Sequence, residues 1–446
     1  MSEDPLLDPT PNINNFDKNP PQKPEETPCS DQINFTDSKK LSLKETLRLS
    51  LTMGLISFGG PVAHIGLFHK IFITDHSLIS EKAFTELFAL CNIIPGPTSS
   101  QLLTSIFLLN SGSILIGIYS FLCFNMPALL VLFLLAFIID EINPKIIETL
   151  SVGIRQAAVA VILQAALTLS KKILNSRFQI ILAASSFLIF LFFNNYIVML
   201  LIMISCAGAA LIYRKDFDKY SINMKESSFE AFKSLKFLGF PSFLVFLAVY
   251  LFIYFLTFHD EDSILTFKLM ESFYRMGSLV IGGGHVIIPM IFSEFIHTNL
   301  LTETQVLDSF ALVSLMPGPM FNLAGYLGFK LAGLFAGLLS AICIFLPGLL
   351  LLFTGLGFMG FINKSRGLQM AIRGVSSAAI GFIFVAVVMM WVEMMMGVKK
   401  NGGMGEFLEG AYKSILVGIY LLLLEKFKFH VLIVFLISLL VSIFIQ

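Results

Sequence analysis

The chain has 446 residues, of which 56% are hydrophobic and only 13% are charged, and its 30 basic and 30 acidic residues balance to a net charge of zero. This balance favours no electrostatic partner such as nucleic acid, and the long continuous apolar runs exclude the short alternating segments of a β-barrel. We expect an all-α polytopic protein, integral and multi-pass in a lipid bilayer, because helices satisfy their own backbone groups in lipid.

Residues 1 to 40 are the first predicted element, a disordered polar tail. They contain seven of the 17 prolines and eight acidic against four basic residues, so they have too few apolar side chains to order themselves. The tail lacks the basic start and apolar stretch of a secretory signal, and it is too acidic for a transit peptide.

Residues 43 to 170 form the first of two predicted halves. Its helical pieces at about 62 to 73, 81 to 94 and 97 to 109 reach only about 18 to 20 Å, short of the roughly 30 Å hydrocarbon layer. We expect these pieces to pair as re-entrant hairpins that reach half-way across the membrane, where irregular backbone is tolerated only beside protein or a water-filled cavity.

The second half, residues 264 to 393, repeats the first. The order of matching residues is kept while their offset drifts only from 223 to 218, and chance similarity between apolar helices would not keep Gly, Pro and Arg aligned. The matches are Met53-Gly54 with Met276-Gly277, Gly59-Gly60 with Gly282-Gly283, Glu81 with Glu303, Phe88-Ala89-Leu90 with Phe310-Ala311-Leu312, Pro95-Gly96-Pro97 with Pro317-Gly318-Pro319, Pro127 with Pro347, and Ile154-Arg155 with Ile372-Arg373.

The positive-inside rule predicts that the two halves are inverted. Basic residues near its start place the first half's beginning in the cytoplasm, and the acidic loop 140 to 148 lies outside. Spans 178 to 193 and 196 to 213 then return the chain to a basic cytoplasmic linker, 214 to 236, and one further span, 237 to 257, starts the second half outside. Inverted repeats build many secondary transporters, with the substrate near mid-membrane where broken helices meet.

The remaining segments connect or follow these halves. Residues 171 to 263 hold the linking transmembrane helices and the basic loop, and residues 394 to 446 hold a C-terminal loop and further transmembrane helices. Lys399 and Lys400 fall outside under this scheme, against the positive-inside rule.

Each half contains a Pro-Gly-Pro sequence inside an apolar run, NIIPGPTSSQ at 92 to 101 and SLMPGPMFNL at 314 to 323. Proline removes a backbone donor and clashes with the preceding turn, so we expect both helices to break here. The helix after a break starts with unpaired N–H groups and the positive end of its dipole, which favours an anion. The predicted substrate-binding residues at the breaks are Pro95, Gly96, Pro97, Thr98, Ser99, Ser100, Pro317, Gly318, Pro319 and Asn322. The alternative is a pair of hairpin turns with capping hydroxyls.

Two glycine-rich stretches, 58 to 66 and 281 to 289, place flexible backbone opposite the breaks. Glycine lets a ligand or another helix approach the backbone closely. The predicted substrate-binding positions in these stretches are Gly59, Gly60, Gly282 and Gly283.

Four ionisable residues are candidates for proton coupling. His64 and His285 lie at nearly matching positions, where the alternative is a hydrogen-bonded structural histidine. Glu86 and Asp308 each lie nine residues before a Pro-Gly-Pro in an apolar helix, where an ionisable group is costly and burial raises a carboxyl pKa. The alternative places them near the interface, paired with Lys82 or a neighbouring helix.

Arg155 and Arg373 occupy matching places in the last helix of each half and are further substrate-binding candidates. The planar guanidinium suits a tetrahedral oxyanion, and the alternative is that both snorkel to an interface.

No cofactor or enzymatic machinery is predicted. The cysteines are scattered without CxxC or Cys/His spacing, which fits isolated thiols rather than disulfides or a metal site; they are Cys29, Cys91, Cys123, Cys206 and Cys343. A pairing of nucleophile and base does not appear in the sequence, so an intramembrane enzyme has the least support.

The glycine motif Phe58-Gly59-Gly60-Pro61 with Ala63-His64-Ile65, the stretch from Gly282 to Pro289, and Pro-Gly-Pro in both halves resemble the chromate ion transporter family in its long, two-domain form. The resemblance covers roughly 43 to 393. It implies a membrane carrier of chromate, with sulfate-like oxyanions as suspected relatives, driven by an ion gradient or the membrane potential. It also implies functional positions at Gly59, Gly60, Pro61, Pro95, Gly96, Pro97, Gly282, Gly283, Pro317, Gly318 and Pro319.

The leading hypothesis is a secondary active transporter of tetrahedral oxyanions, chromate and by extension sulfate, that works by alternating access between inverted repeats. The alternative is an anion channel with the same funnel of helix ends. The expected partners are a small inorganic oxyanion, a coupling ion (a proton or sodium) and the lipid bilayer, with a homodimer as one candidate assembly.

Overall fold

The computed structural model describes residues 41–141, 144–213, 236–258, 265–281, 283–296, 298–358, 361–362, 365–396 and 404–445. Within these ranges every regular element is a helix. Five helices are long and apolar enough to cross a membrane: Ile114–Ile138, Leu150–Ile173, Lys236–Thr257, Asn322–Gly357 and Arg366–Met395. The all-α polytopic fold is therefore confirmed, and the protein is integral to a membrane and multi-pass. The predicted tail, residues 1 to 40, and nearly all of the basic linker lie outside the described residues.

The first half begins with short helical pieces of 6 to 14 residues, as predicted. They are α1 (Leu43–Ile56), α2 (Gly60–His69), the π-helical turn η2 (Lys70–Asp75), α3 (Glu81–Ile93) and α4 (Thr98–Ser111). Serine side chains start two of them, because Ser42 accepts the Glu45 N–H and Ser80 accepts the Ala83 N–H. The π-helical turn has no local signal in the sequence.

The first half ends with two long helices, α5 (Ile114–Ile138) and α6 (Pro144–Ile173), with the 3₁₀ turn η3 (Ile139–Glu141) between them. The loop predicted at 140 to 148 is too long, since α6 already begins at Pro144. Proline is favoured at the first helical position, where its missing N–H costs nothing.

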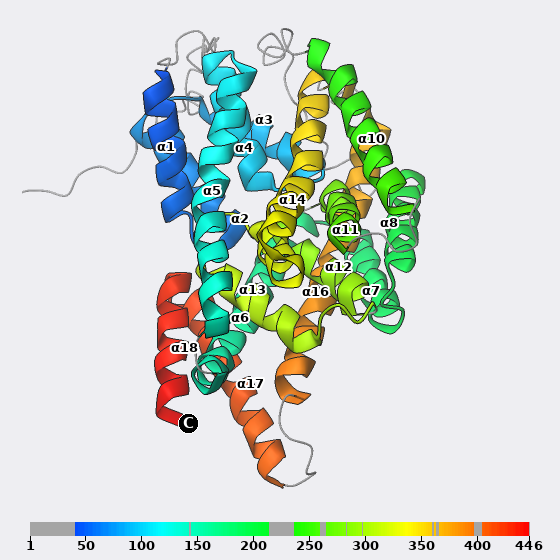
Figure 1. The fold of residues 1–446 in the computed structure, drawn as a ribbon. Coiled ribbons are helices and arrows are strands. Elements are labelled where there is room, and N and C mark those ends of the chain that lie inside the picture. The colour runs from blue at the N-terminus through cyan, green and yellow to red at the C-terminus, as the bar shows by residue number, and fades with distance from the viewer. Residues whose placement is uncertain are drawn as a thin grey trace, which may run out of the picture.

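The linking region contains α7 (Arg177–Phe192), α8 (Tyr196–Ile212) and α10 (Lys236–Phe258), close to the three predicted spans. Helices α7 and α8 pack against α16 (Arg366–Met396) of the second half. In Figure 1 they lie on the side of the molecule away from α1 and α5.

The second half shows the same order of elements as the first. It contains α11 (Leu265–Leu279), η6 (Gly284–Val286), α12 (Ile287–Ile291), the π-helical turn η7 (Phe292–Ile296), α13 (Glu303–Leu315), α14 (Asn322–Gly357) and α16. Helix α14 covers the positions of both α4 and α5, and it is kinked where Ala332 and Gly333 leave helical geometry. A π-helical turn follows the glycine motif in both halves. This order agrees with the predicted duplication, and the inversion of the second copy stays a prediction.

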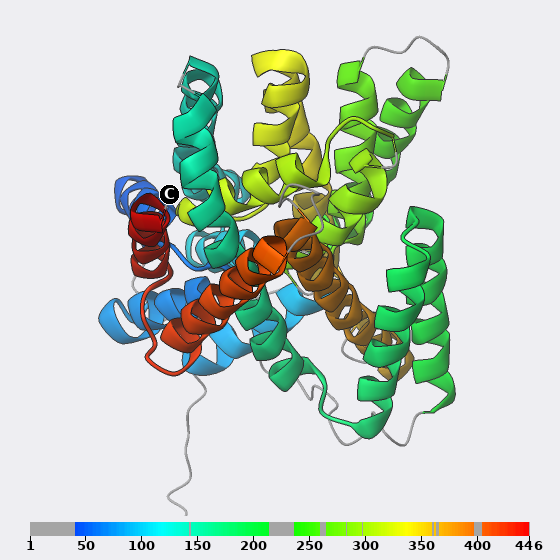
Figure 2. The ribbon, with the colours of Figure 1, turned by 90° about the horizontal axis from the view of Figure 1, so that it is seen from below.

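Two further helices follow, α17 (Met404–Glu425) and α18 (Val431–Ile445). Both pack against α6, and Figure 1 shows α18 beside α6 near the C-terminus. Seen from below in Figure 2, α16 and α17 cross the middle of the molecule, whereas α7 and α8 lie at the edge opposite α18.

Small residues let the long helices approach the short ones closely in both halves. A Cβ at Gly54 of α1 would lie 2.6 Å from the Phe124 carbonyl oxygen of α5, and a Cβ at Gly277 of α11 would lie 2.2 Å from the Ile344 carbonyl oxygen of α14. Each glycine therefore fixes the backbone contact that positions the end of α1 or α11 in the interior.

Candidate functional site

Both Pro-Gly-Pro sequences interrupt helices, as predicted. Helix α3 ends at Ile93 and α4 begins at Thr98, while α13 ends at Leu315 and α14 begins at Asn322. The central glycines adopt φ of 125° at Gly96 and 100° at Gly318, a conformation that L side chains rarely adopt.

The breaks meet the glycine motif of the opposite half. The Gly96 N–H donates to the carbonyl oxygen of Val280 just after α11, and the Gly318 N–H donates to that of Ser57 just after α1, each over 2.7 Å. The two glycine motifs also meet, since a Cβ at Gly60 would lie 3.4 Å from Nε2 of His285. Four helix interruptions therefore converge where the two halves touch. Gly282 lies outside the described residues.

The convergence is buried and rich in polar atoms without partners. Ser57, His64, Thr98, Gln101, His285 and Asn322 are all buried. Atoms without a hydrogen-bond partner here include Ser57 Oγ, Thr98 Oγ1, Gln101 Oε1, His285 Nδ1 and Asn322 Oδ1. Buried polar groups are normally satisfied, so such a cluster indicates a place for a polar ligand or water.

A small cavity lies beside one of these groups, His285. Its volume is about 10 Å³, it is lined by Gly59, Gly60, Gly318 and Met320 among others, and it has room for about one water molecule. The centre is closed at this cavity, because the space is far smaller than an oxyanion needs.

The start of α4 is held by amide and hydroxyl contacts from other elements. Gln101 Nε2 donates to the carbonyl oxygens of Pro95, at 2.8 Å, and Gly348, at 2.9 Å. The Ser100 hydroxyl donates to Asn125 Oδ1 of α5 at 3.0 Å, so Ser100 offers a ligand its backbone N–H and not its hydroxyl hydrogen. The sequence places Gln101 at this helix start as an amide donor, but it gives no sign of Asn125, because a buried amide on another helix is identified only by what surrounds it.

Two predicted functional residues form an ion pair between the halves. Arg155 of α6 bonds both carboxylate oxygens of Asp308 in α13; its Nη2 lies 2.7 Å from Oδ2, and its Nε bonds Oδ1. The side chains are 20% and 35% exposed. The guanidinium predicted to bind the anion is thus neutralised by the carboxylate predicted to carry a proton.

Glu86 matches Asp308, and Arg373 matches Arg155, and both lie on the equivalent helices of the opposite half. Glu86 is buried in α3 and Arg373 is half-buried in α16, and these two helices are in contact. The side chain of Lys82, the alternative partner for Glu86, is outside the described part of the structure.

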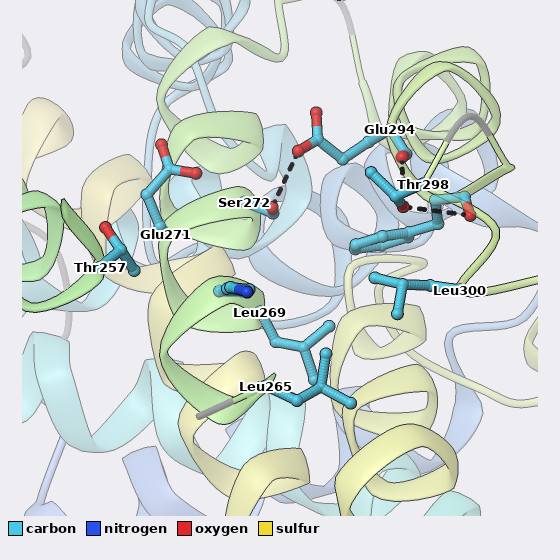
Figure 3. Close-up of a pocket in the computed structure, with 10 residues that line it drawn as sticks. Thr257, Leu265, Leu269, Glu271, Ser272, Glu294, Thr298 and Leu300 are labelled. Carbon is cyan, nitrogen blue, oxygen red and sulfur yellow. Dashed lines mark hydrogen bonds between the residues drawn. The ribbon is translucent and has the colours of Figure 1, made fainter. Parts of the chain in front are cut away.

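A larger cavity of about 420 Å³ lies beside α11 and η7. Glu271 and Glu294 are among the residues that line it (Figure 3), and the Ser272 hydroxyl donates to Glu294 Oε1 at 3.0 Å. Arg275 bonds both carboxylates. Sequence reasoning missed this cluster, although the spacing of Glu271 and Arg275 is typical of a helical ion pair. Lys268 also lines the cavity, so the charges of Lys268 and Arg275 balance those of Glu271 and Glu294 and leave no net attraction for an anion. The helix breaks are therefore the better candidate site.

These features define a polytopic helical membrane protein with a polar centre built from helix interruptions. The chain matches the family model described as chromate transporter over residues 45–211 and 267–443, and it belongs to the chromate transporter family. The resemblance seen in the sequence is thereby confirmed.

Several proteins that are named as chromate transport proteins or as transporters are similar to most of the chain. A probable chromate transport protein of Synechococcus elongatus is 24% identical over 78% of this chain and 84% of its own length. A chromate transport protein of Pseudomonas aeruginosa is 22% identical over 75% of this chain and 77% of its own, and an uncharacterized transporter of Methanocaldococcus jannaschii is 25% identical over 69% and 74%. No solved structure matches the chain. Family membership supports a chromate transport role, with a small anion as substrate, rather than an enzyme.

Proposed function

We propose that the protein is a secondary active transporter of tetrahedral oxyanions, chromate and by extension sulfate, and that it works by alternating access between two inverted repeats. The observation that carries this proposal is the reciprocal pair of hydrogen bonds from Gly96 to Val280 and from Gly318 to Ser57. In a pseudo-twofold arrangement, a hydrogen bond from one half to the other is matched by an equivalent bond in the reverse direction, as these two are.

The interrupted helices supply the anion contacts in this proposal. Backbone N–H groups at a helix start, reinforced by the helix dipole, bind a negative charge without a buried cation. Because the cavity beside the second break measures about 10 Å³, the halves have to separate on one side to admit an oxyanion there. Closure around the anion and opening on the other side then complete transport.

Buried ionisable groups near the breaks are the candidates for coupling. His64 and His285 are buried in the two glycine motifs, and Glu86 is buried in α3. A proton taken up by one of them offsets part of the charge of the anion, and sodium is the other candidate coupling ion.

The test is chromate flux into proteoliposomes that contain the purified protein. We expect saturable flux that responds to an imposed pH or sodium gradient, and loss of flux in the double variant Pro95→Ala with Pro317→Ala. Flux that persists in this variant would remove the breaks from the mechanism. A conductance that rises linearly with voltage and does not saturate would instead identify an anion channel.

A further inference from the structure

The two helix starts at the breaks differ in their free backbone donors. In α4 the first intrahelical bond runs from the Gln101 N–H to the Pro97 carbonyl oxygen at 2.9 Å, which leaves the N–H groups of Thr98, Ser99 and Ser100 without a partner in the helix. Pro97 provides no side-chain cap. The start of α4 is therefore buried with three amides pointing beyond its end.

In α14 one of the three corresponding amides is already used. Because Pro319 matches Pro97, the equivalent amides are those of Met320, Phe321 and Asn322, and the Asn322 N–H donates to the Pro319 carbonyl oxygen at 3.1 Å in a tight turn, which leaves two amides where α4 has three. The flanking side chains Met320 and Phe321 are apolar and buried. Of the two breaks, the start of α4 is the better equipped to hold an anion.

Side chains at the start of α4 add one donor and one acceptor. The Thr98 hydroxyl, in a residue only 3% exposed, has no partner and can donate. Gln101 is 0% exposed, and because its Nε2 already donates to two carbonyl oxygens, its unpartnered Oε1 is left as a fixed acceptor. A ligand that satisfies these groups has to accept hydrogen bonds from the Thr98 hydroxyl and the amides, and it has to donate one hydrogen bond to Gln101 Oε1.

Permanent cations are scarce in the interior. Among the described residues, the buried side chains of Lys, Arg, His, Asp and Glu are His64, His285, Glu86 and Lys413, and Arg373 is half-buried. Lys413 lies on α17 and pairs with Glu409, and Arg155 pairs with Asp308. The cost of burying a charge rises with its square, so a doubly charged anion costs about four times as much to bury here as a singly charged one.

We propose that the start of α4 binds the oxyanion in its singly charged, hydrogen-carrying form, as hydrogen chromate rather than the chromate dianion. The hydroxyl of the anion donates to Gln101 Oε1, and its other oxygens accept from the Thr98 hydroxyl and the three free amides. After release, the anion dissociates into the dianion and a proton, so the proton crosses the membrane on the substrate. This inference rests on the proposed transport function.

Other charged or titratable protein groups belong to the same region, and the test has to separate their effect from that of the substrate. His64 on α2 and Glu86 on α3 belong to helices that contact α4, and His285 lies in η6. The Arg155–Asp308 pair joins α6 to α13, and Arg373 lies on α16. Protonation of either histidine would tighten the binding of any anion at low pH. Perrhenate, a tetrahedral oxyanion that stays singly charged and carries no proton, reports this effect alone.

The experiment is equilibrium binding of chromate, sulfate and perrhenate to the purified full chain in detergent across a pH series. We calculate the apparent affinity from the total concentration of chromate and hydrogen chromate. It should fall about tenfold per pH unit above the pKa of hydrogen chromate, because only the protonated fraction binds. Perrhenate affinity should change far less over the same pH range, and sulfate, which stays doubly charged, should bind at least about tenfold more weakly than chromate. Equal pH dependence for chromate and perrhenate, or sulfate binding as tight as chromate, would overturn the proposal. Failure of the protein to bind or transport any of the three would instead refute the transport function.

A variant isolates the acceptor. Gln101→Leu should weaken chromate binding about tenfold while perrhenate, which has no hydrogen to donate, loses less. Thr104→Val is the control on the same helix, since the Thr104 hydroxyl donates to the Ser100 carbonyl oxygen at 2.8 Å one turn further along. Equal losses for both anions in Gln101→Leu would show that Gln101 acts on the fold and not on the hydrogen of the substrate.

Discussion

The ion pair between Arg155 and Asp308 should behave as a bridge between the halves and not as an anion site. Both charges are partly exposed, at 20% and 35%, so the cost of removing one partner lies between that of a surface pair and that of a buried pair. We expect about 2 kcal/mol for Arg155→Gln or Asp308→Asn, a factor of about 30 in the folding equilibrium. Arg155→Asp combined with Asp308→Arg should recover most of this loss, because the pair is restored in reverse.

The assay is thermal unfolding of the purified variants, together with chromate binding. Arg177→Gln, which removes the same charge from an exposed position at the start of α7, is the control and should change neither quantity. If Asp308→Asn unfolds like the wild type while Arg155→Gln weakens chromate binding tenfold or more, Arg155 binds the anion and the bridge interpretation is refuted.

Three further substitutions test other parts of the structure. Gly96→Ala should cost about 3 kcal/mol and lower the yield of folded protein, because φ is 125° and the new Cβ would lie 2.7 Å from the Gly348 Cα; Gly66→Ala, whose Cβ meets nothing within 4 Å, should fold normally. Thr98→Val should weaken chromate binding about tenfold in an equilibrium binding assay, whereas Thr104→Val should not. Glu425→Gln removes a carboxyl whose pKa is lowered by its hydrogen bond to Lys171. A group with a lowered pKa stabilises the fold above its usual pKa, and this stabilisation is lost as the pH falls through its lowered pKa. Glu425→Gln should therefore reduce the free energy of unfolding by about 0.5 kcal/mol at neutral pH, and the difference from the wild type should vanish in acid.

The sequence predicted the interruptions well because proline and glycine act on the backbone locally. A proline removes an N–H wherever the chain goes next, so the ends of α3 and α13 could be placed to within a few residues. Capping serines and threonines before Glu81 and Glu303 likewise act over one turn. The all-α class followed from apolar runs that leave few other solutions in lipid.

Contacts across the halves could not be predicted in the same way. Asp308 was predicted as a costly charge in an apolar helix and Arg155 as an anion-binding guanidinium, yet 153 residues separate them, and their pairing depends on how α6 packs on α13. The Gln101 amide gives no sequence signal that it reaches Gly348, 247 residues away. The kink at Gly333 and the two π-helical turns depend on the same tertiary packing.

The reciprocal bonds also suggest why the two breaks should act together in the proposed mechanism. Each break donates its glycine N–H to the backbone at the end of α1 or α11 in the other half, so displacing one break leaves a buried carbonyl in the opposite half without its donor. An unpaired buried backbone group costs about 1 to 3 kcal/mol. Neither half can therefore shift its break alone without a penalty, and that penalty disfavours states in which one break has moved and the other has not. An anion at the start of α4 provides new hydrogen bonds to the moving backbone and can offset this cost. The opening of the Gly96–Val280 and Gly318–Ser57 contacts would then depend on the presence of substrate.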